Sequence, residues 1–247
     1  TSSSVITREK IRAKQPRNIS DIFDETAGTY ASDEPQSPGV NVNLRGLQDQ
    51  GRINMMIDGV RQTFQRSGHG STAYVFVAPS MVRAVNIEKS TPSGVGGAAS
   101  LGGSVNFRTL IADDIIQSGK EYGAELNLAH GTNEFDLDGS ISGAARINSN
   151  FSVLASLSRK ELGEYSIGKN GSLESFNGTP VISQSFTGST ETSGLLKAEL
   201  FLNDDMTLEA SWLGYQGEYS TGTDAFSQDQ KLTNHTLGLQ YDWQPDN

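Results

Sequence analysis

Cysteine is absent from the 247 residues, which excludes a disulfide-stabilised scaffold and a thiolate metal site. No run of about 18 apolar residues occurs, so no membrane-spanning helix is predicted. Only 35% of the chain is hydrophobic and 27 residues are glycine, a composition untypical of a compact helical protein. Clustered histidines and a G-x-S-x-G nucleophile elbow are also missing, so we do not expect an enzyme.

Charge is distributed unevenly along the chain and indicates a boundary. Residues 1–109 carry 12 Lys and Arg against 9 Asp and Glu, whereas residues 110–247 carry 7 against 20. This asymmetry predicts two different units joined near Ile111. A nucleic-acid partner is not expected, because neutralising phosphates in the acidic half would require Lys and Arg.

The second half alternates apolar and polar residues with the period of a β-strand. One face of the first segment carries Tyr122, Ala124, Leu126 and Leu128, while Glu121, Glu125 and Asn127 lie on the other. The pattern predicts six strands, over 121–130, 134–146, from 151 onward, 194–202, 206–216 and 235–243. Segments of roughly 9 to 11 residues are long enough to cross a bilayer when tilted.

The connections between these segments alternate in length. Residues 147–150 and 203–205 are short turns, whereas 164–191 and 217–234 are long and polar. This asymmetry is typical of a bacterial outer-membrane barrel, and Tyr122, Tyr241 and Trp243 fall where its aromatic girdle belongs. The alternative is a soluble β-sandwich with one wet face. Six strands cannot close a barrel, and a lumen that holds a separate domain needs about 22, so we expect further strands outside this sequence.

Four short segments of the first half carry a family resemblance. They are NLRG at 43–46, IDGVR at 57–61, VNIEK at 85–89 and GGSVNF at 102–107. Together they resemble the plug domain of TonB-dependent outer-membrane receptors. The resemblance implies a mixed α/β plug over residues 16–110 and the first part of a transmembrane β-barrel over 111–247. Residues 1–15 would be an unstructured periplasmic tether.

The same resemblance implies a function and partners. Such receptors are active importers of the bacterial outer membrane, with a barrel surrounded by lipid, closed by its plug and energised from the inner membrane through TonB. Residues 1–18 contain no clear TonB-binding segment, so we expect that segment to lie elsewhere. Arg45, Arg61 and Arg108 are predicted to dock the plug against acidic residues inside the barrel; the alternative is that they are solvated surface charges.

Three histidines are candidates for binding a ligand. His130 and His235 share the register of the apolar, lipid-facing residues, whereas His69 lies between two glycines in a polar segment of the predicted plug. The surrounding sequence, QTFQRSGHGSTAYVF, resembles the plug of receptors that take haem from a secreted haemophore.

That resemblance implies that haem is the transported ligand and that imidazole binds its iron, with His69 as our candidate. Arg66 is predicted to meet a haem propionate, and Phe64 or Tyr74 to pack on the porphyrin. The second iron ligand is expected beyond Asn247, and a haemophore or haemoprotein is the expected donor. A ferric-siderophore receptor, or an adhesin whose plug never moves, remains the alternative.

Overall fold

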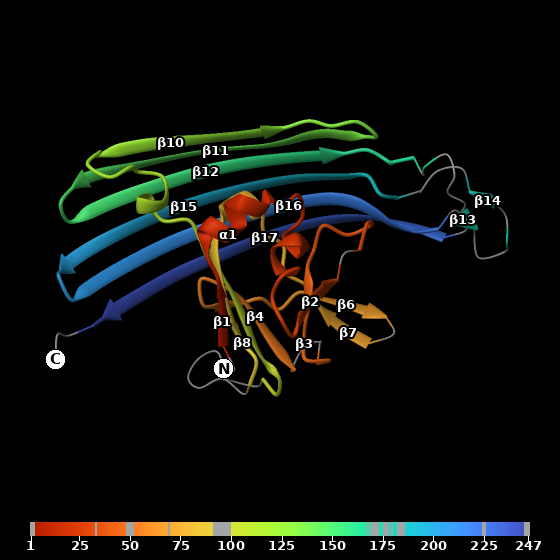
Figure 1. Ribbon diagram of the computed structural model, residues 1–247, viewed down its shortest axis with the longest axis horizontal. Helices are drawn as coiled ribbons and strands as arrows, with labels where there is room; N and C mark the ends of the chain where they lie inside the picture. The colour runs from red at the N-terminus through yellow and green to blue at the C-terminus, as the bar shows by residue number, and fades with distance from the viewer. Residues whose placement is uncertain are drawn as a thin grey trace.

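The structure is a computed structural model that describes residues 3–32, 34–47, 52–68, 70–90, 100–166, 168, 173–174, 178, 180–181, 186–223 and 226–244. It has two units: an N-terminal one of small sheets and short helices, and a six-stranded antiparallel sheet. We call the first the plug and the second the wall. The plug lies against one face of the wall, and the strands of its main sheet run across those of the wall (Figure 1). The predicted fold class, a mixed plug followed by antiparallel barrel strands, is confirmed.

The plug is built around a five-stranded sheet. Its strands follow the order β1 (Ser3–Ile6), β8 (Val82–Glu88), β9 (Gly103–Thr109), β4 (Ile53–Ile57) and β5 (Val60–Arg61). Strands β4 and β9 pair parallel, and the other neighbours pair antiparallel. Two separate hairpins join β2 (Thr29–Ser32) to β3 (Asn41–Leu44) and β6 (Gln65–Gly68) to β7 (Gly70–Ala73).

Helices are short throughout the described part of the chain. They are α1 (Arg8–Lys14) and the 3₁₀ turns η1 (Ile19–Phe23), η2 (Pro79–Met81) and η4 (Ala112–Asp114). Asn18 caps η1 together with Asp21, whose carboxylate accepts hydrogen bonds from the backbone N–H groups of Arg17 and Asn18, both at 2.9 Å. No helix among the described residues is long and apolar enough to cross a membrane.

The unstructured tether predicted over residues 1–15 is wrong where the structure describes it. Strand β1 joins the main sheet, with Ser3 opposite Glu88 and Ile6 opposite Val85. Helix α1 follows directly, and both Ile6 and Ile11 are buried in the plug core. These two apolar side chains order the segment, because their burial offsets the conformational entropy lost on folding.

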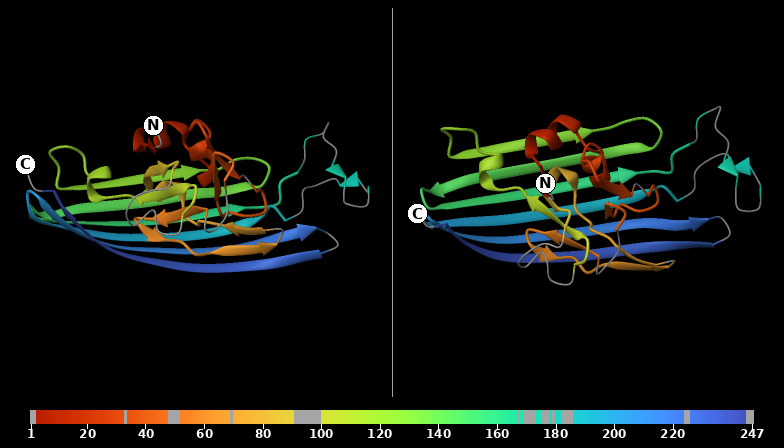
Figure 2. Two further views of the ribbon diagram at one scale, coloured as in Figure 1. Left: turned by 90° about the horizontal axis from the view of Figure 1, so that it is seen from below. Right: turned by 60° about the horizontal axis from the view of Figure 1, so that its bottom comes forward.

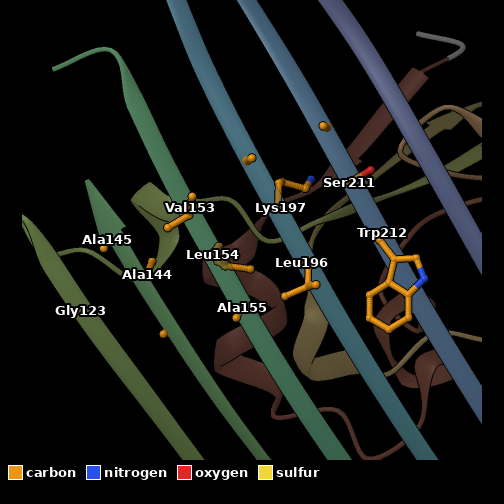
Figure 3. Close-up of a pocket in the computed structure, with 13 residues that line it drawn as sticks. Gly123, Ala144, Ala145, Val153, Leu154, Ala155, Leu196, Lys197, Ser211 and Trp212 are labelled. Atoms are coloured by element: carbon orange, nitrogen blue, oxygen red, sulfur yellow. The ribbon is translucent and has the colours of Figure 1, made fainter. Parts of the chain in front are cut away.

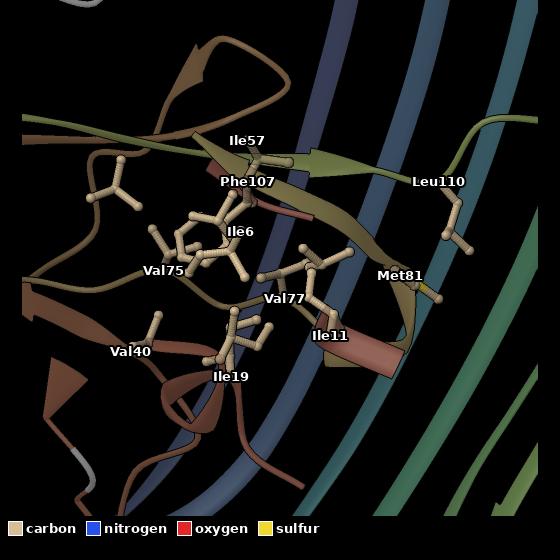
Figure 4. Packing of buried hydrophobic residues seen from close by; sticks show 14 of the residues in the cluster. Ile6, Ile11, Ile19, Val40, Ile57, Val75, Val77, Met81, Phe107 and Leu110 are labelled. Carbon is tan, nitrogen blue, oxygen red and sulfur yellow. The ribbon is translucent and has the colours of Figure 1, made fainter. Parts of the chain in front are cut away.

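One hydrophobic core fills the plug and extends into the wall (Figure 4). Phe23 and Phe107 pack edge to face at its centre, with ring centroids 5.8 Å apart. Four inward-facing wall residues belong to the same core: Ala144, Leu154, Leu195 and Leu213. The plug and the wall therefore exclude water from one continuous apolar interface.

Gly103 permits the close approach of β8 and β9. Its φ is +137°, and a Cβ atom placed there would lie 2.0 Å from the carbonyl oxygen of Glu88. No L-residue with a side chain fits that position without moving the backbone of β8. This explains why glycine stands at the start of β9 in the GGSVNF segment.

The wall contains six strands in chain order. They are β10 (Tyr122–Ala129), β11 (Phe135–Asn148), β12 (Phe151–Leu162), β15 (Ser189–Asn203), β16 (Met206–Thr223) and β17 (Phe226–Trp243). A small hairpin, β13 (Leu173–Glu174) with β14 (Pro180–Val181), lies in the connection from β12 to β15. Figure 2 shows the sheet curving around the plug. The predicted alternation is confirmed, since Leu126 and Leu239 are exposed on the outer face while Ser156 and Thr236 are buried on the inner one.

The last two strands are longer than the sequence pattern predicts. Residues 217–234 were predicted to form a long loop, yet β16 and β17 continue as a ladder up to the pair Thr223 and Phe226. Their polar side chains bond across the strands, as Lys231 does with Glu218 at 2.6 Å and Ser220 with Asp229 at 2.8 Å. Such polar cross-strand pairs stabilise the hairpin beyond the apolar band, where outward-facing residues are no longer apolar. The short turns after β11 and β15 are confirmed.

Candidate functional site

The outer face of the wall is apolar in the way that a lipid-facing surface requires. Small and aliphatic side chains line a shallow hollow of about 770 Å³, bordered by Trp212, and the plug lies behind the sheet in this view (Figure 3). Tyr122, Tyr241 and Trp243 are exposed at the end with the short turns, as predicted for an aromatic girdle. The short-turn end is therefore the periplasmic side and the long-connection end the outer side.

The deepest contact between plug and wall is a buried ion pair. Lys197 of β15 points inward, and its Nζ lies 3.1 Å from Asp58 Oδ2 in the plug and 3.1 Å from Glu209 Oε1 in β16. The Lys197 side chain is only 1% exposed and that of Asp58 5%. Here the wall supplies the cation and the plug the anion, which is the reverse of the predicted charge arrangement.

The local backbone aims Asp58 at this position. It directly follows β4 in a turn with φ of +45°, and Gly59 continues the turn at +78°. The carboxylate also caps β9: Oδ1 accepts a 2.9 Å hydrogen bond from the Thr109 N–H, and Oδ2 one from the Thr109 hydroxyl. Arg108 Nε lies 3.6 Å from Oδ1. The IDGVR segment thus holds the counter-ion of Lys197 on a fixed turn.

The three arginines that were predicted to dock the plug lie in different settings. Arg108 reaches the wall and donates a 3.3 Å hydrogen bond to Gln240 Oε1 of β17. Arg45 instead donates to the Lys89 carbonyl within the plug, at 3.1 Å. Arg61 is exposed and makes no hydrogen bond or ion pair with any described residue. Of the three, only Arg108 bridges the plug and these six strands.

Helix α1 also docks the plug against the wall, although the sequence analysis assigned docking to other arginines. Arg8 and Arg12 each lie 3.3 Å from Glu125 Oε2, an inward-facing residue of β10. Arg8 also lies 3.9 Å from Asp114 of η4. On the solvent side of the helix, a hydrogen bond from the Thr7 side chain lowers the pKa of the Glu9 carboxyl below its ordinary value. Because residues 1–15 were assigned to a tether, the sequence analysis missed this part of the interface.

Contacts nearer the outer side are polar and more exposed. Lys160 of β12 donates 2.7 Å hydrogen bonds to the Arg17 carbonyl and to Asn18 Oδ1 in the plug. The Gln36 side chain exchanges two hydrogen bonds with the backbone of Gly222, at 3.0 and 3.1 Å. The plug is thus held by a buried inner set of contacts and a less buried, polar outer set.

An aromatic cluster lies at the base of the β6–β7 hairpin. Phe64 packs edge to face on Phe76, with centroids 5.0 Å apart, and Phe76 packs on Tyr215 of β16 at 5.4 Å. Phe64 is 37% exposed, whereas Tyr74 is 8% exposed and donates a 3.0 Å hydrogen bond to Glu34. Of the predicted porphyrin neighbours, Phe64 therefore offers an accessible face, and Tyr74 supports it from below together with Phe76.

Two of the three histidines can be placed. His130 is exposed at the outer end of β10, with Nδ1 2.6 Å from the Asp136 carbonyl oxygen. His235 is exposed in the outward register and stacks on Trp212 at 5.9 Å. It lies in the middle of β17, opposite Gly214, because β17 extends from Phe226 to Trp243 and not only over the predicted residues 235–243. Residue His69 and the side chain of Arg66 lie outside the described part of the chain.

No group of three or more His, Asp or Glu residues able to hold a metal ion occurs among the residues that the structure describes. The site is accordingly assembled from an aromatic surface, a hairpin and two sets of plug–wall contacts. Its architecture is that of an outer-membrane β-barrel whose lumen is occupied by a separate domain. Residues 1–104 match the family of TonB-dependent receptor plug domains. Residues 1–104 thus belong with the plug domains of TonB-dependent receptors, and the chain as a whole is similar to such receptors.

Relatives and solved structures agree with this assignment. The chain is 35% identical over 134 residues to a probable TonB-dependent receptor of Haemophilus influenzae, covering 51% of this chain and 15% of the relative. It is 31% identical over 121 residues to the hemophilin receptor of Acinetobacter baumannii, covering 48% and 11%.

One solved structure is similar over nearly all of the chain. It is a double mutant of the Serratia marcescens haemophore receptor HasR in complex with its haemophore HasA and haem. The TM-score is 0.79 at 32% identity, covering 96% of this chain and 34% of the other. The chain thus spans between a tenth and about a third of the length of these relatives.

Proposed function

We propose that the full-length receptor imports haem across the outer membrane with energy delivered through TonB. The observation that carries the proposal is the likeness to a haemophore receptor solved with haem, which extends over 96% of this chain at 32% identity. The hemophilin receptor among the curated relatives supports the same ligand class. A secreted haemophore or a haemoprotein is the proposed donor.

The geometry of the plug supports a haem site at the β6–β7 hairpin. The hairpin lies on the side of the plug that faces the long-connection end of the wall (Figure 1). At its base, Phe64 presents an exposed ring on a buried aromatic support. A porphyrin packs favourably on such a ring. His69 stands between the two strands in the sequence and is the proposed axial ligand of the haem iron, with Arg66 as the proposed propionate partner.

The test is a haem titration, followed by absorbance, of the purified full-length receptor. His69→Ala is expected to weaken binding at least tenfold and to shift the Soret band, because the iron loses a nitrogen ligand. His130→Ala and His235→Ala are matched controls, since both side chains lie on the outer register of the wall, away from the plug. Both are expected to bind like the parent.

The outcomes separate the alternatives. An unchanged Soret band and affinity in His69→Ala would dismiss the ligand assignment. A parent receptor that binds no haem favours a ferric-siderophore receptor instead. Haem binding without TonB-dependent growth of an iron-starved host on haem points to a surface binding protein.

A further inference from the structure

A polar cavity lies between the plug and the outer half of the wall. Its volume is about 510 Å³, within the range of roughly 300 to 1,000 Å³ typical of small-molecule sites. The plug contributes residues 17–21, 32, 34–35 and 37–39, and the wall contributes the outer ends of β11, β12 and β15. The cavity is therefore on the side from which cargo arrives, and it is separate from the β6–β7 hairpin.

One cation that lines this cavity has unused hydrogen-bond donors. The Arg17 guanidinium lies over the Phe135 ring, 5.8 Å from its centroid, and makes no hydrogen bond or ion pair with any described residue. A guanidinium stacked on an aromatic ring is held in place, while its edge presents N–H groups in the geometry that fits a carboxylate. Lys160 lines the cavity beside it, and two of the three protons of its ammonium group are engaged with the plug.

The carboxylates of the cavity are for the most part already engaged. Asp21 accepts two backbone N–H groups, Glu34 accepts the Tyr74 hydroxyl, and Glu191 accepts the Tyr215 hydroxyl at 2.9 Å. Glu134 lies against Gly163 at the hairpin tip. Apolar side chains from both units complete the lining: Ile19, Pro35, Pro38 and Leu162. The cavity thus offers apolar walls and one preorganised carboxylate binder.

The plug–wall contacts differ in burial on the two sides of the cavity. On the outer side they are the hydrogen bonds of Lys160 with the 17–18 segment and of Gln36 with Gly222, which are exposed or half-buried. On the periplasmic side the buried pair of Lys197 and Asp58 seals the interface. A ligand can therefore enter by loosening the outer contacts while the inner seal stays closed.

We propose that this cavity is a second cargo subsite, beside the hairpin where cargo first binds. It takes an amphipathic molecule and holds its carboxylate edge on Arg17. The assignment of haem as that molecule rests on the proposed function. Haem fits the chemistry because its porphyrin is apolar and its two propionates lie on one edge.

The experiment uses single-cysteine variants of the full-length receptor and a maleimide probe. Ser189 lies on the inner face of β15 and lines the cavity, whereas its neighbour Thr190 faces the opposite side of the strand. Haem is expected to slow labelling of Ser189→Cys at least fivefold and to leave labelling of Thr190→Cys unchanged. At saturating haem, adding Arg17→Met is expected to abolish the protection and to remove one equivalent of bound haem, while the affinity of the remaining equivalent stays within twofold of the parent.

Transport provides the second measurement. Ser189→Trp fills much of the cavity and is expected to lower TonB-dependent haem uptake at least tenfold while haem binding at the hairpin keeps its parental affinity, whereas Thr190→Trp transports normally. Full labelling of Ser189→Cys in a receptor whose Soret band shows bound haem overturns the subsite, as does parental uptake by Ser189→Trp. A parent without any Soret band overturns the proposed function itself, and so the two failures are distinguishable.

Discussion

Removing the charge of Lys197 tests whether the buried pair seats the plug in the barrel. In Lys197→Met the side chain keeps its length, but Asp58 and Glu209 lose a cation that lies 3.1 Å from each of them. Asp58 retains Thr109 and Arg108, whereas no other described residue forms an ion pair with Glu209. Removing one partner of a buried ion pair costs about 3–5 kcal/mol, because the remaining charge stays desolvated.

Hydrogen exchange of the β4 amides in the full-length receptor measures the effect. Strand β4 ends beside Asp58, so opening of the inner contact exposes its backbone. At about 1.4 kcal/mol per tenfold change, the loss corresponds to exchange that is faster by roughly 10² to 10⁴. The added substitution Glu209→Gln is expected to restore much of the protection, because it removes the unpaired buried charge.

A matched control is available on the same wall. Lys231 and Glu218 form an ion pair at 2.6 Å, but their side chains are 66% and 50% exposed. Exposed pairs contribute about 0–1 kcal/mol, so Lys231→Met is expected to change β4 exchange less than about fivefold. If Lys197→Met exchanges within threefold of the parent, the burial argument is refuted and the apolar interface alone seats the plug.

Three further substitutions test other parts of the structure. Gly103→Ala places a Cβ atom against the Glu88 carbonyl and should destabilise the plug sheet; preserved β8 and β9 amide protection would contradict this. Glu125→Gln removes the counter-charge of two α1 arginines and should raise proteolysis of residues 3–14 in low salt, with a smaller difference in high salt. Leu157→Arg places a charge on the lipid face and should destabilise the barrel by about 2–4 kcal/mol in denaturant titrations in liposomes, against no comparable loss in Leu157→Ile.

The wall was predictable because its signal repeats. Successive side chains of a barrel strand point alternately to lipid and to the lumen, so apolar and polar residues alternate with a period of two. The direction of one side chain therefore predicts the direction of the next. The pattern failed where that solvent contrast ends: beyond the apolar band, the polar residues 217–234 resemble a loop although they pair in a ladder. The sequence analysis therefore gave the strands their membrane-crossing lengths and not their full lengths.

The plug–wall interface was predictable only in part, because pairing depends on distant segments. Leu195 and Leu196 are adjacent apolar residues in β15, and one of them must face inward, where a water-filled lumen would be polar. That break in alternation was a usable signal of plug contact, since Leu195 lies in the shared core. By contrast, nothing local distinguishes Lys197 from a solvated lumen lysine, because its burial is created by Asp58, 139 residues away.

The two sets of plug–wall contacts also bear on why such a receptor requires outside energy. The outer contacts are exposed or half-buried hydrogen bonds, so each contributes on the order of 1 kcal/mol, which the binding of a cargo molecule readily exceeds. The inner set consists of a buried ion pair and a continuous apolar core. Breaking the ion pair alone costs about 3–5 kcal/mol. Cargo that contacts only the outer set has no differential affinity for a state in which the inner set is open, so its binding cannot shift that equilibrium. For the import proposed above, opening the inner seal therefore needs energy from a source other than cargo binding, which is the part assigned to TonB.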